Sequence, residues 1–216
     1  MEYNMLSGNE TLTYKGEDLP FTIQKYWQLN LSVLLLNVIR GGFAEYLVLC
    51  ALDKVMPDAL SQVKSGMEEC DIDGPEISLS GEKRRSRIEV KSTATVQLTS
   101  PDGVEIEPLP DSRLTFSIRK STTEKDPDPK RHNDLYVFCH YKATRKSDNI
   151  MNLDLWDFYV YPTYLIEENE SISEQKTISI WRLRQLGVQP HGFDTLCQAI
   201  LDVQKQIEEH YNNRLG

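Results

Sequence analysis

The sequence has little that would place the chain in a membrane. Its longest apolar stretch, residues 31–39, is interrupted by Ser32 and Asn37 and is too short to span a bilayer. The first residues, MEYNMLSGNETLTYKGED, have neither the basic region nor the apolar core of a signal peptide. We therefore expect no association with a membrane.

Cysteine is also scarce. The chain has 4 cysteines that lie far apart, without a CxxC pair and without a histidine at ligand spacing. This pattern argues against a zinc site and against a thioredoxin-like motif. Three of the four lie within apolar runs, where a free, buried thiol is the usual state. A chain of 216 residues needs no disulfides to fold, so we expect a cytoplasmic protein.

Basic residues are few, and the net charge of −9 appears unfavourable for binding nucleic acid. The charges are distributed unevenly, however. Residues 1–80 hold 5 basic and 12 acidic side chains, residues 81–146 hold 14 and 10, and residues 147–216 hold 5 and 11. Because salt screens distant charges beyond about 10 Å, the net-basic middle third can still bind phosphates. A block of charge can equally be only a solvated face.

The order of the expected elements indicates an α/β fold. Residues 1–20 show no periodicity, and we expect them to form an N-terminal arm. We expect residues 21–216 to form a single domain. We expect helices at 21–38, 43–54 and 193–211, with Gly41-Gly42 interrupting the first two. We expect strands at 76–80, 87–91, 114–118, 135–139, 156–161 and 176–180. Helices at both ends of the chain around strands predict a central sheet flanked by helices on both sides.

The middle of the chain contains a hairpin pattern with a possible catalytic strand. Residues 81–86 are expected to form the turn between strands 76–80 and 87–91. Glu89 and Lys91 are two residues apart, so they project from the same face of their strand. Such a pair can be a surface ion pair. It can also serve phosphodiester hydrolysis, because Mg²⁺ is bound by one or two carboxylates with waters and substrate oxygens. The second carboxylate would come from the preceding strand, from Asp71, Asp73 or Glu76.

Five segments carry a resemblance to a known family. They are RGGFAE (40–45), MEECDI (67–72), EVKSTA (89–94), DLYVFC (134–139) and LDLWDFYVYPT (153–163). This arrangement resembles the PD-(D/E)xK, or restriction-endonuclease-like, nuclease superfamily. It is most similar to a bacterial group within it that has RGxxAE, WDxYDL, EVKS(S/T)A, DxYVFC and LDLxxWEFYVxPT segments. The similarity extends from about residue 27 to residue 193.

The resemblance implies a restriction-endonuclease-like core, with a central mixed β-sheet, and a site for Mg²⁺ or Mn²⁺. It assigns the two metal ligands to Asp71 and Glu89, the positioning of the attacking water to Lys91, and support of the metal to Glu45. Gln97 matches a glutamine of the group without a defined role. The sequence departs from the group at Met67-Glu68 and Cys70, and its hairpin is several residues longer. The longer hairpin leaves Asp73 and Glu76 as alternatives to Asp71.

The function implied by the resemblance is that of a nuclease, a hydrolase that cleaves DNA. The hairpin has four basic side chains that are candidates for phosphate contacts: Lys83, Arg84, Arg85 and Arg87. Alternatively, these charges only protect the hairpin tip from aggregation. The alternative is a catalytically degenerate domain that binds a protein or a nucleic acid without cutting it, which suits the acidic surface. A homodimer is expected only by analogy with relatives that cut two strands.

Overall fold

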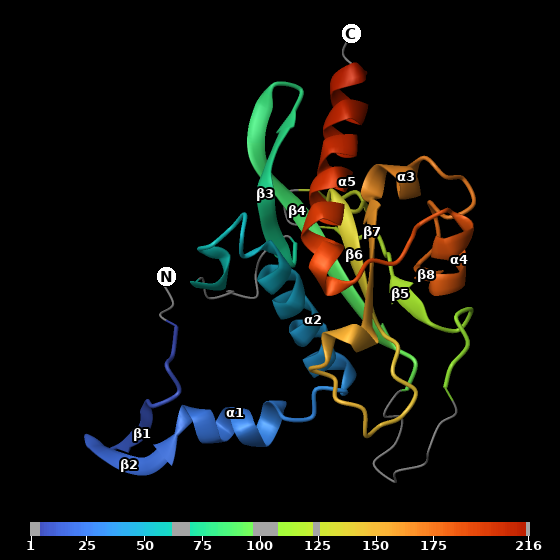
Figure 1. The fold of residues 1–216 in the computed structure, drawn as a ribbon. Coiled ribbons are helices and arrows are strands. Elements are labelled where there is room, and N and C mark those ends of the chain that lie inside the picture. Colours follow the sequence, from blue (N-terminus) through green and yellow to red (C-terminus); the bar gives the residue numbers. More distant parts are fainter. Residues whose placement is uncertain (1–4, 62–69, 97–107, 123–125, 215–216) are drawn as a thin grey trace.

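The computed structural model describes residues 5–61, 70–96, 108–122 and 126–214. The chain begins with a two-stranded hairpin and a short helix, which project from the rest of the molecule (Figure 1). These elements are β1 (Thr11–Tyr14), β2 (Glu17–Thr22) and α1 (Ile23–Leu31). The α2 helix (Asn37–Leu52) and a 3₁₀ turn (Ala59–Ser61) follow.

A four-stranded mixed sheet forms the centre of the fold, in the order β3-β4-β6-β7. The β3 and β4 strands are antiparallel, β4 and β6 are parallel, and β6 and β7 are antiparallel. Every residue of β6 is buried, as its apolar sequence LYVFCHY requires of a strand covered on both faces. The strands are β3 (Ile72–Leu79), β4 (Glu82–Ala94), β6 (Leu135–Tyr141) and β7 (Trp156–Pro162), the last preceded by a 3₁₀ turn (Leu153–Leu155).

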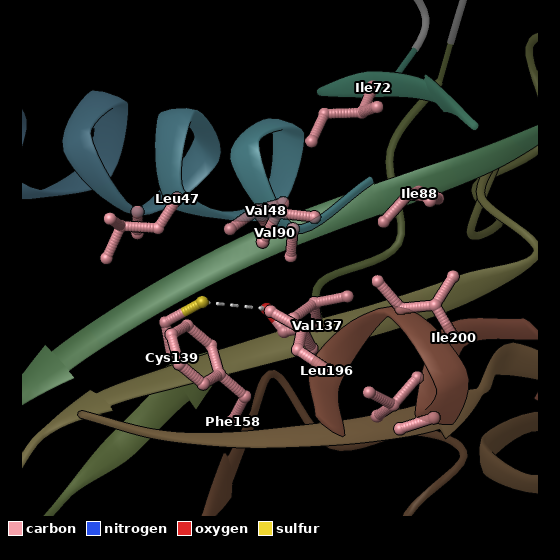
Figure 2. Packing of buried hydrophobic residues seen from close by; sticks show 14 of the residues in the cluster. Leu47, Val48, Ile72, Ile88, Val90, Val137, Cys139, Phe158, Leu196 and Ile200 are labelled. Atoms are coloured by element: carbon pink, nitrogen blue, oxygen red, sulfur yellow. Dashed lines mark hydrogen bonds between the residues drawn. The ribbon is translucent and has the colours of Figure 1, made fainter. Parts of the chain in front are cut away.

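Each face of the sheet has its own hydrophobic core. On one face α2 and α5 cover side chains such as Ile88, Val90 and Val137, as Figure 2 shows. The other face contains Tyr136 and Phe138 and is covered by a small β5-β8 sheet and two short helices. The covering elements are α5 (Phe193–Asn213), α3 (Thr163–Glu167), α4 (Ile180–Gln185), β5 (Thr115–Ser117) and β8 (Thr177–Ser179). The predicted α/β class, with a central mixed sheet flanked by helices, is confirmed.

Three predicted local features were wrong. The helix expected at 21–38 is divided, because α1 ends at Leu31 and α2 begins at Asn37. The turn of the β3–β4 hairpin is Ser80-Gly81, both with positive φ, so residues 82–86 belong to β4 rather than to the turn. Two successive residues with positive φ fit the tight two-residue turns that join twisted antiparallel strands. The Gly41-Gly42 pair lies inside α2 and does not interrupt it. Burial of Ala44, Leu47 and Val48 against the sheet outweighs the cost of about 1 kcal/mol for each helical glycine.

A bulge interrupts the pairing of the β3–β4 hairpin. Ile72 pairs with Ile88 and Asp73 with Arg87, but the register shifts before the pairing of Glu76 with Arg85. Gly74 lies in this bulge, and a Cβ there would stand 2.4 Å from Ser86 Oγ and 2.6 Å from Ile88 Cδ1, so a larger residue would clash. The bulge therefore sets the register at the base of the hairpin, where Ile72 pairs with Ile88. In the described part of the chain, no helix is long and apolar enough to cross a membrane.

Candidate functional site

The Asp71 carboxylate completes the edge of the sheet at the base of the hairpin. The pairing of β3 with β4 begins at Ile72, opposite Ile88. Two residues further along β4, the Val90 amide donates its hydrogen bond to Asp71 Oδ2 at 2.8 Å. An acid at this position therefore has a structural role, because it satisfies a strand N–H. The same role fixes the carboxylate beside the outward-facing residues of β4.

Glu89 and Lys91 lie on the same face of β4, as predicted from their spacing. The neighbouring residues Ile88 and Val90 point into the core on the opposite face. The ammonium of Lys91 contacts Asp71 Oδ2 at 3.2 Å and also forms a close ion pair with Glu89 Oε1. Two carboxylates from different segments of the chain therefore converge on one cation. Their side chains are only 25% and 24% exposed, and that of Lys91 is 29% exposed.

Burial and neighbouring charges together shift the pKa values of Glu89 and Lys91. Burial raises the pKa of Glu89, and the charges of Asp71 and Glu45 raise it further, while Lys91 counteracts them. For Lys91, burial works to lower the pKa, but attraction by Glu89 and Asp71 outweighs it and the pKa is raised. One lysine therefore holds two carboxylates, with a third acid close enough to act on Glu89.

Glu45 lies on α2, the helix that covers the face of the sheet opposite Glu89, and it is near enough for its charge to act on Glu89. It is half-buried, and its charge acts on both Glu89 and Cys139. Arg40, one turn earlier on α2, is 3% exposed, and its Nη1 donates to the Leu35 carbonyl at 3.1 Å. Burial lowers the pKa of Arg40 to about 10. The RGGFAE segment thus places one cation and one acid beside β4.

The two alternative acids lie elsewhere on the hairpin. Asp73 is exposed and accepts a weak hydrogen bond from the Cys70 thiol at 3.7 Å. Glu76 is beyond the bulge and pairs with Lys83 at 3.0 Å, with both side chains mostly exposed. Of the three candidate acids, Asp71 is the one whose carboxylate shares a contact with Glu89 through Lys91. Met67, Glu68 and Gln97 lie outside the described residues.

The four basic candidates for phosphate contacts are engaged within the hairpin and its surroundings. Arg84 forms a two-pronged pair with Asp134, at 2.7 Å for each bond. Arg85 Nη1 donates to the Gly74 carbonyl at 3.4 Å, and Arg87 Nη1 donates to the His132 carbonyl at 3.3 Å. These residues follow one another along β4 and do not form a single cluster at the hairpin tip.

A cavity of about 780 Å³ opens beside Arg87, and no sequence pattern indicates it. Its walls come from the segment that precedes β6, from α3 and from the end of α5, so no single motif encodes it. Tyr164 in the wall stacks on His210, with ring centroids 3.8 Å apart. Charges in the wall are paired, as between Arg131 and Glu167 at 2.7 Å. The cavity is thus polar but close to balanced in charge.

The site differs from a metal centre built entirely from protein ligands. Among the residues that the structure describes, no three His, Cys, Asp or Glu side chains are grouped to hold a metal ion. All four cysteines are free thiols. No family model, curated protein or solved structure matches this chain. The chemistry of the site must therefore be argued from its own geometry.

Proposed function

We propose that the protein is a nuclease that hydrolyses phosphodiester bonds of DNA with Mg²⁺ or Mn²⁺ held by Asp71 and Glu89. The observation that carries the proposal is the convergence of these two carboxylates on one cation, the ammonium of Lys91. Mg²⁺ needs only one or two carboxylates, since waters and substrate oxygens complete its coordination. A pair of acids is therefore a sufficient protein contribution.

The donor set fits a hard divalent cation. Both acids supply carboxylate oxygens, which are the ligands that Mg²⁺ prefers. Burial raises the pKa of Glu89, and the charges of Asp71 and Glu45 add to that shift, so a divalent cation beside Glu89 would favour its ionised form. A bound metal would supply an activated water and neutralise charge on the phosphate. Glu45 would stabilise the metal from α2 through an intervening water.

Lys91 has two roles in this proposal. In the protein alone, its ammonium holds the two carboxylates together and limits their repulsion. With metal and substrate bound, it would leave this position, orient the attacking water and stabilise charge developing on the phosphate. Arg87 projects from the same face of β4 as Glu89, since it lies two residues earlier. It would contact a phosphate next to the scissile one, and Lys83, Arg84 and Arg85 would contact phosphates further along the DNA.

A second function is favoured by a specific observation. Lys91 already neutralises the carboxylate pair, and Arg84 is committed to Asp134. Both arrangements suit a domain that keeps a restriction-endonuclease-like core but binds a protein or a nucleic acid without cutting it. The free thiols support a reducing, cytoplasmic location for either function.

The experiment compares the native chain with Lys91→Ala and with Lys205→Ala, a lysine of α5 whose side chain is 75% exposed and has no part in the proposed site. Supercoiled and single-stranded DNA are incubated with each protein in Mg²⁺, in Mn²⁺ and with chelator. We expect metal-dependent cleavage by the native chain and by Lys205→Ala, and a loss of at least about 100-fold in Lys91→Ala. Cleavage that persists in Lys91→Ala would rule out the mechanism.

Calorimetry separates the two functions. We expect Mg²⁺ or Mn²⁺ to bind the native chain, and binding to be lost in Asp71→Asn and Glu89→Gln but retained in Glu76→Gln. Glu76 is the matched control, because it is a carboxylate of the same hairpin that pairs with a lysine away from the site. The absence of both cleavage and metal binding in the native chain would favour the binding module.

A further inference from the structure

The N-terminal extension, residues 5–36, presents most of the exposed apolar side chains of the described chain. Among the described residues, sixteen large hydrophobic side chains are exposed, and eleven of these are Val38 or belong to the extension directly before it. The other ten are Met5, Leu6, Leu12, Tyr14, Phe21, Tyr26, Leu29, Leu31, Val33 and Leu36. Such a concentration marks a surface that another molecule covers.

The elements of the extension are too small to be stable by themselves. The α1 helix has nine residues and none of them is buried. Isolated helices shorter than about 12 residues are marginal in water. The β1–β2 hairpin has only two strands, and a lone two-stranded hairpin is at best marginally stable. Figure 1 shows these elements projecting away from the central sheet. A covering surface is therefore needed to stabilise them.

The charge of the extension indicates the chemistry of that surface. It carries Lys15 and Lys25 against Glu10, Glu17 and Asp18, so it is nearly neutral and lacks a basic face. A polyanion such as DNA would find little attraction here. The complementary surface is instead apolar and uncharged. The extension itself has that character, whereas a chain of net charge −9 repels its copies elsewhere on the surface.

The two strands of the hairpin differ in how their edges are protected. In the described residues, β1 pairs only with β2. The β2 sequence EDLPFT contains a proline and two acids, which hinder pairing along its outer edge. The β1 sequence TLTY has no proline and no charge. An unprotected strand edge is a template for pairing with another strand.

We propose that two copies of the chain form a dimer through this extension, with their β1 edges paired antiparallel about a two-fold axis. Pairing of a strand with its own copy gives the self-complementary contact that a two-fold dimer needs. Leu12 and Tyr14 alternate on one face of β1 and would lie against their copies. The α1 helices would cover the resulting four-stranded sheet.

The apolar area is sufficient for a stable dimer. A large aromatic side chain buries about 150–250 Å², and the eleven side chains here are 43–86% exposed. Covering them removes on the order of 1,000 Å² from each copy. A standard interface buries about 800 Å² from each partner. The dimer is independent of the proposed nuclease activity.

Sedimentation equilibrium of the full chain tests the proposal. We expect the native protein to have twice the mass of the 24.9 kDa chain. The double variant Leu12→Lys/Tyr14→Lys places charges on the β1 edge. We expect it to raise the dissociation constant of the dimer by at least about 100-fold. The control is Trp181→Lys, which removes a 53% exposed aromatic side chain far along the chain on α4 and should leave the dimer intact.

Cross-linking tests the two-fold pairing itself. A cysteine at Leu12 should form a disulfide between copies under mild oxidation, whereas a cysteine at Trp181 should give no more cross-linked product than the native thiols. Three results would overturn the proposal. These are a monomeric native chain at up to about 100 μM, a dimer that survives the double variant, and assemblies that grow beyond two copies.

Discussion

The two ends of the β3–β4 hairpin contain the same kinds of charged residue in different surroundings. At the tip, Glu76 and Lys83 pair at 3.0 Å with side chains that are 61% and 71% exposed. At the base, Lys91 contacts both Asp71 and Glu89, and all three side chains are less than one-third exposed. At the tip, a lysine pairs with one acid in a solvated place. At the base, a lysine pairs with two acids at the edge of the core.

This difference shows why an acid and a lysine two residues apart are uninformative in sequence alone. A solvated pair is screened and contributes about 0–1 kcal/mol, so its loss changes little. At the base, burial raises the pKa of Glu89 and makes each carboxylate depend on its cation. The depth and the second acid, rather than the spacing, make the base a candidate site. The predictions below test this contrast.

Removal of Lys91 should have the largest effect on stability. We expect Lys91→Met to lower the free energy of unfolding by about 2–3 kcal/mol, because it leaves two partly buried carboxylates without their cation. Lys83→Met, at the tip, should change the free energy of unfolding by less than about 0.5 kcal/mol. Urea unfolding of both variants and the native chain gives the comparison.

Metal should reverse part of this loss if the two acids bind it. Mg²⁺ binds the folded state and so raises stability, and we expect a larger rise in Lys91→Met than in the native chain, where the ammonium competes with it. Equal losses in the two lysine variants would show that the base and the tip do not differ. Metal that stabilises the two variants equally would show that Lys91 does not compete with it.

The pH dependence of stability should identify the burial of Glu89. Its pKa in the folded chain is raised above the ordinary value of 4.5. Ionised Glu89 therefore costs stability, a cost that is absent below pH 4.5 and complete once the pH exceeds the folded pKa. We expect the native chain to lose stability relative to Glu89→Gln as pH rises through this window, measured by urea unfolding. Glu76→Gln provides the control. The prediction would be contradicted if the native chain gained stability relative to Glu89→Gln as the pH rises.

Much of the fold could be predicted from sequence, because its elements have strong local patterns. The run LYVFC in β6 and the alternation in β4 follow directly from burial on two faces and on one face. The path through Gly41-Gly42 could not be predicted, since local propensity opposes a helix there and packing on the sheet decides it. Of the site, the shared face of Glu89 and Lys91 follows from strand periodicity.

The partner acid required knowledge of the register. Strand patterning alone leaves Asp71, Asp73 and Glu76 open, and the family resemblance favours Asp71. The bulge at Gly74 sets the register that places Asp71 beside Glu89. The basic residues of β4 can be read from the sequence, but their contacts depend on distant segments such as Asp134. The polar cavity was missed for the same reason, since its walls come from segments far apart in sequence. Whether the site binds metal or DNA remains a prediction.

The smallest expected effect lies between the two ends, at Arg84. Its pair with Asp134 has two bonds of 2.7 Å, and the carboxylate side chain is 12% exposed whereas that of Arg84 is 37% exposed. We expect Arg84→Ala to lower the free energy of unfolding by about 1–2 kcal/mol. The loss is limited because Asp134 keeps its hydrogen bond from the Arg87 amide at 2.8 Å.

Arg85→Ala is the matched control for Arg84, since the neighbouring arginine is exposed and makes a single contact at 3.4 Å with the Gly74 carbonyl. We expect it to change the free energy of unfolding by less than about 0.5 kcal/mol. A loss in Arg84→Ala that lies between those of Lys91→Met and Lys83→Met would show that the importance of each cation follows its depth along the hairpin. If Arg84→Ala instead lowered the free energy of unfolding as much as Lys91→Met, pair geometry would matter more than depth. The stability of the base would then depend on the number of its contacts.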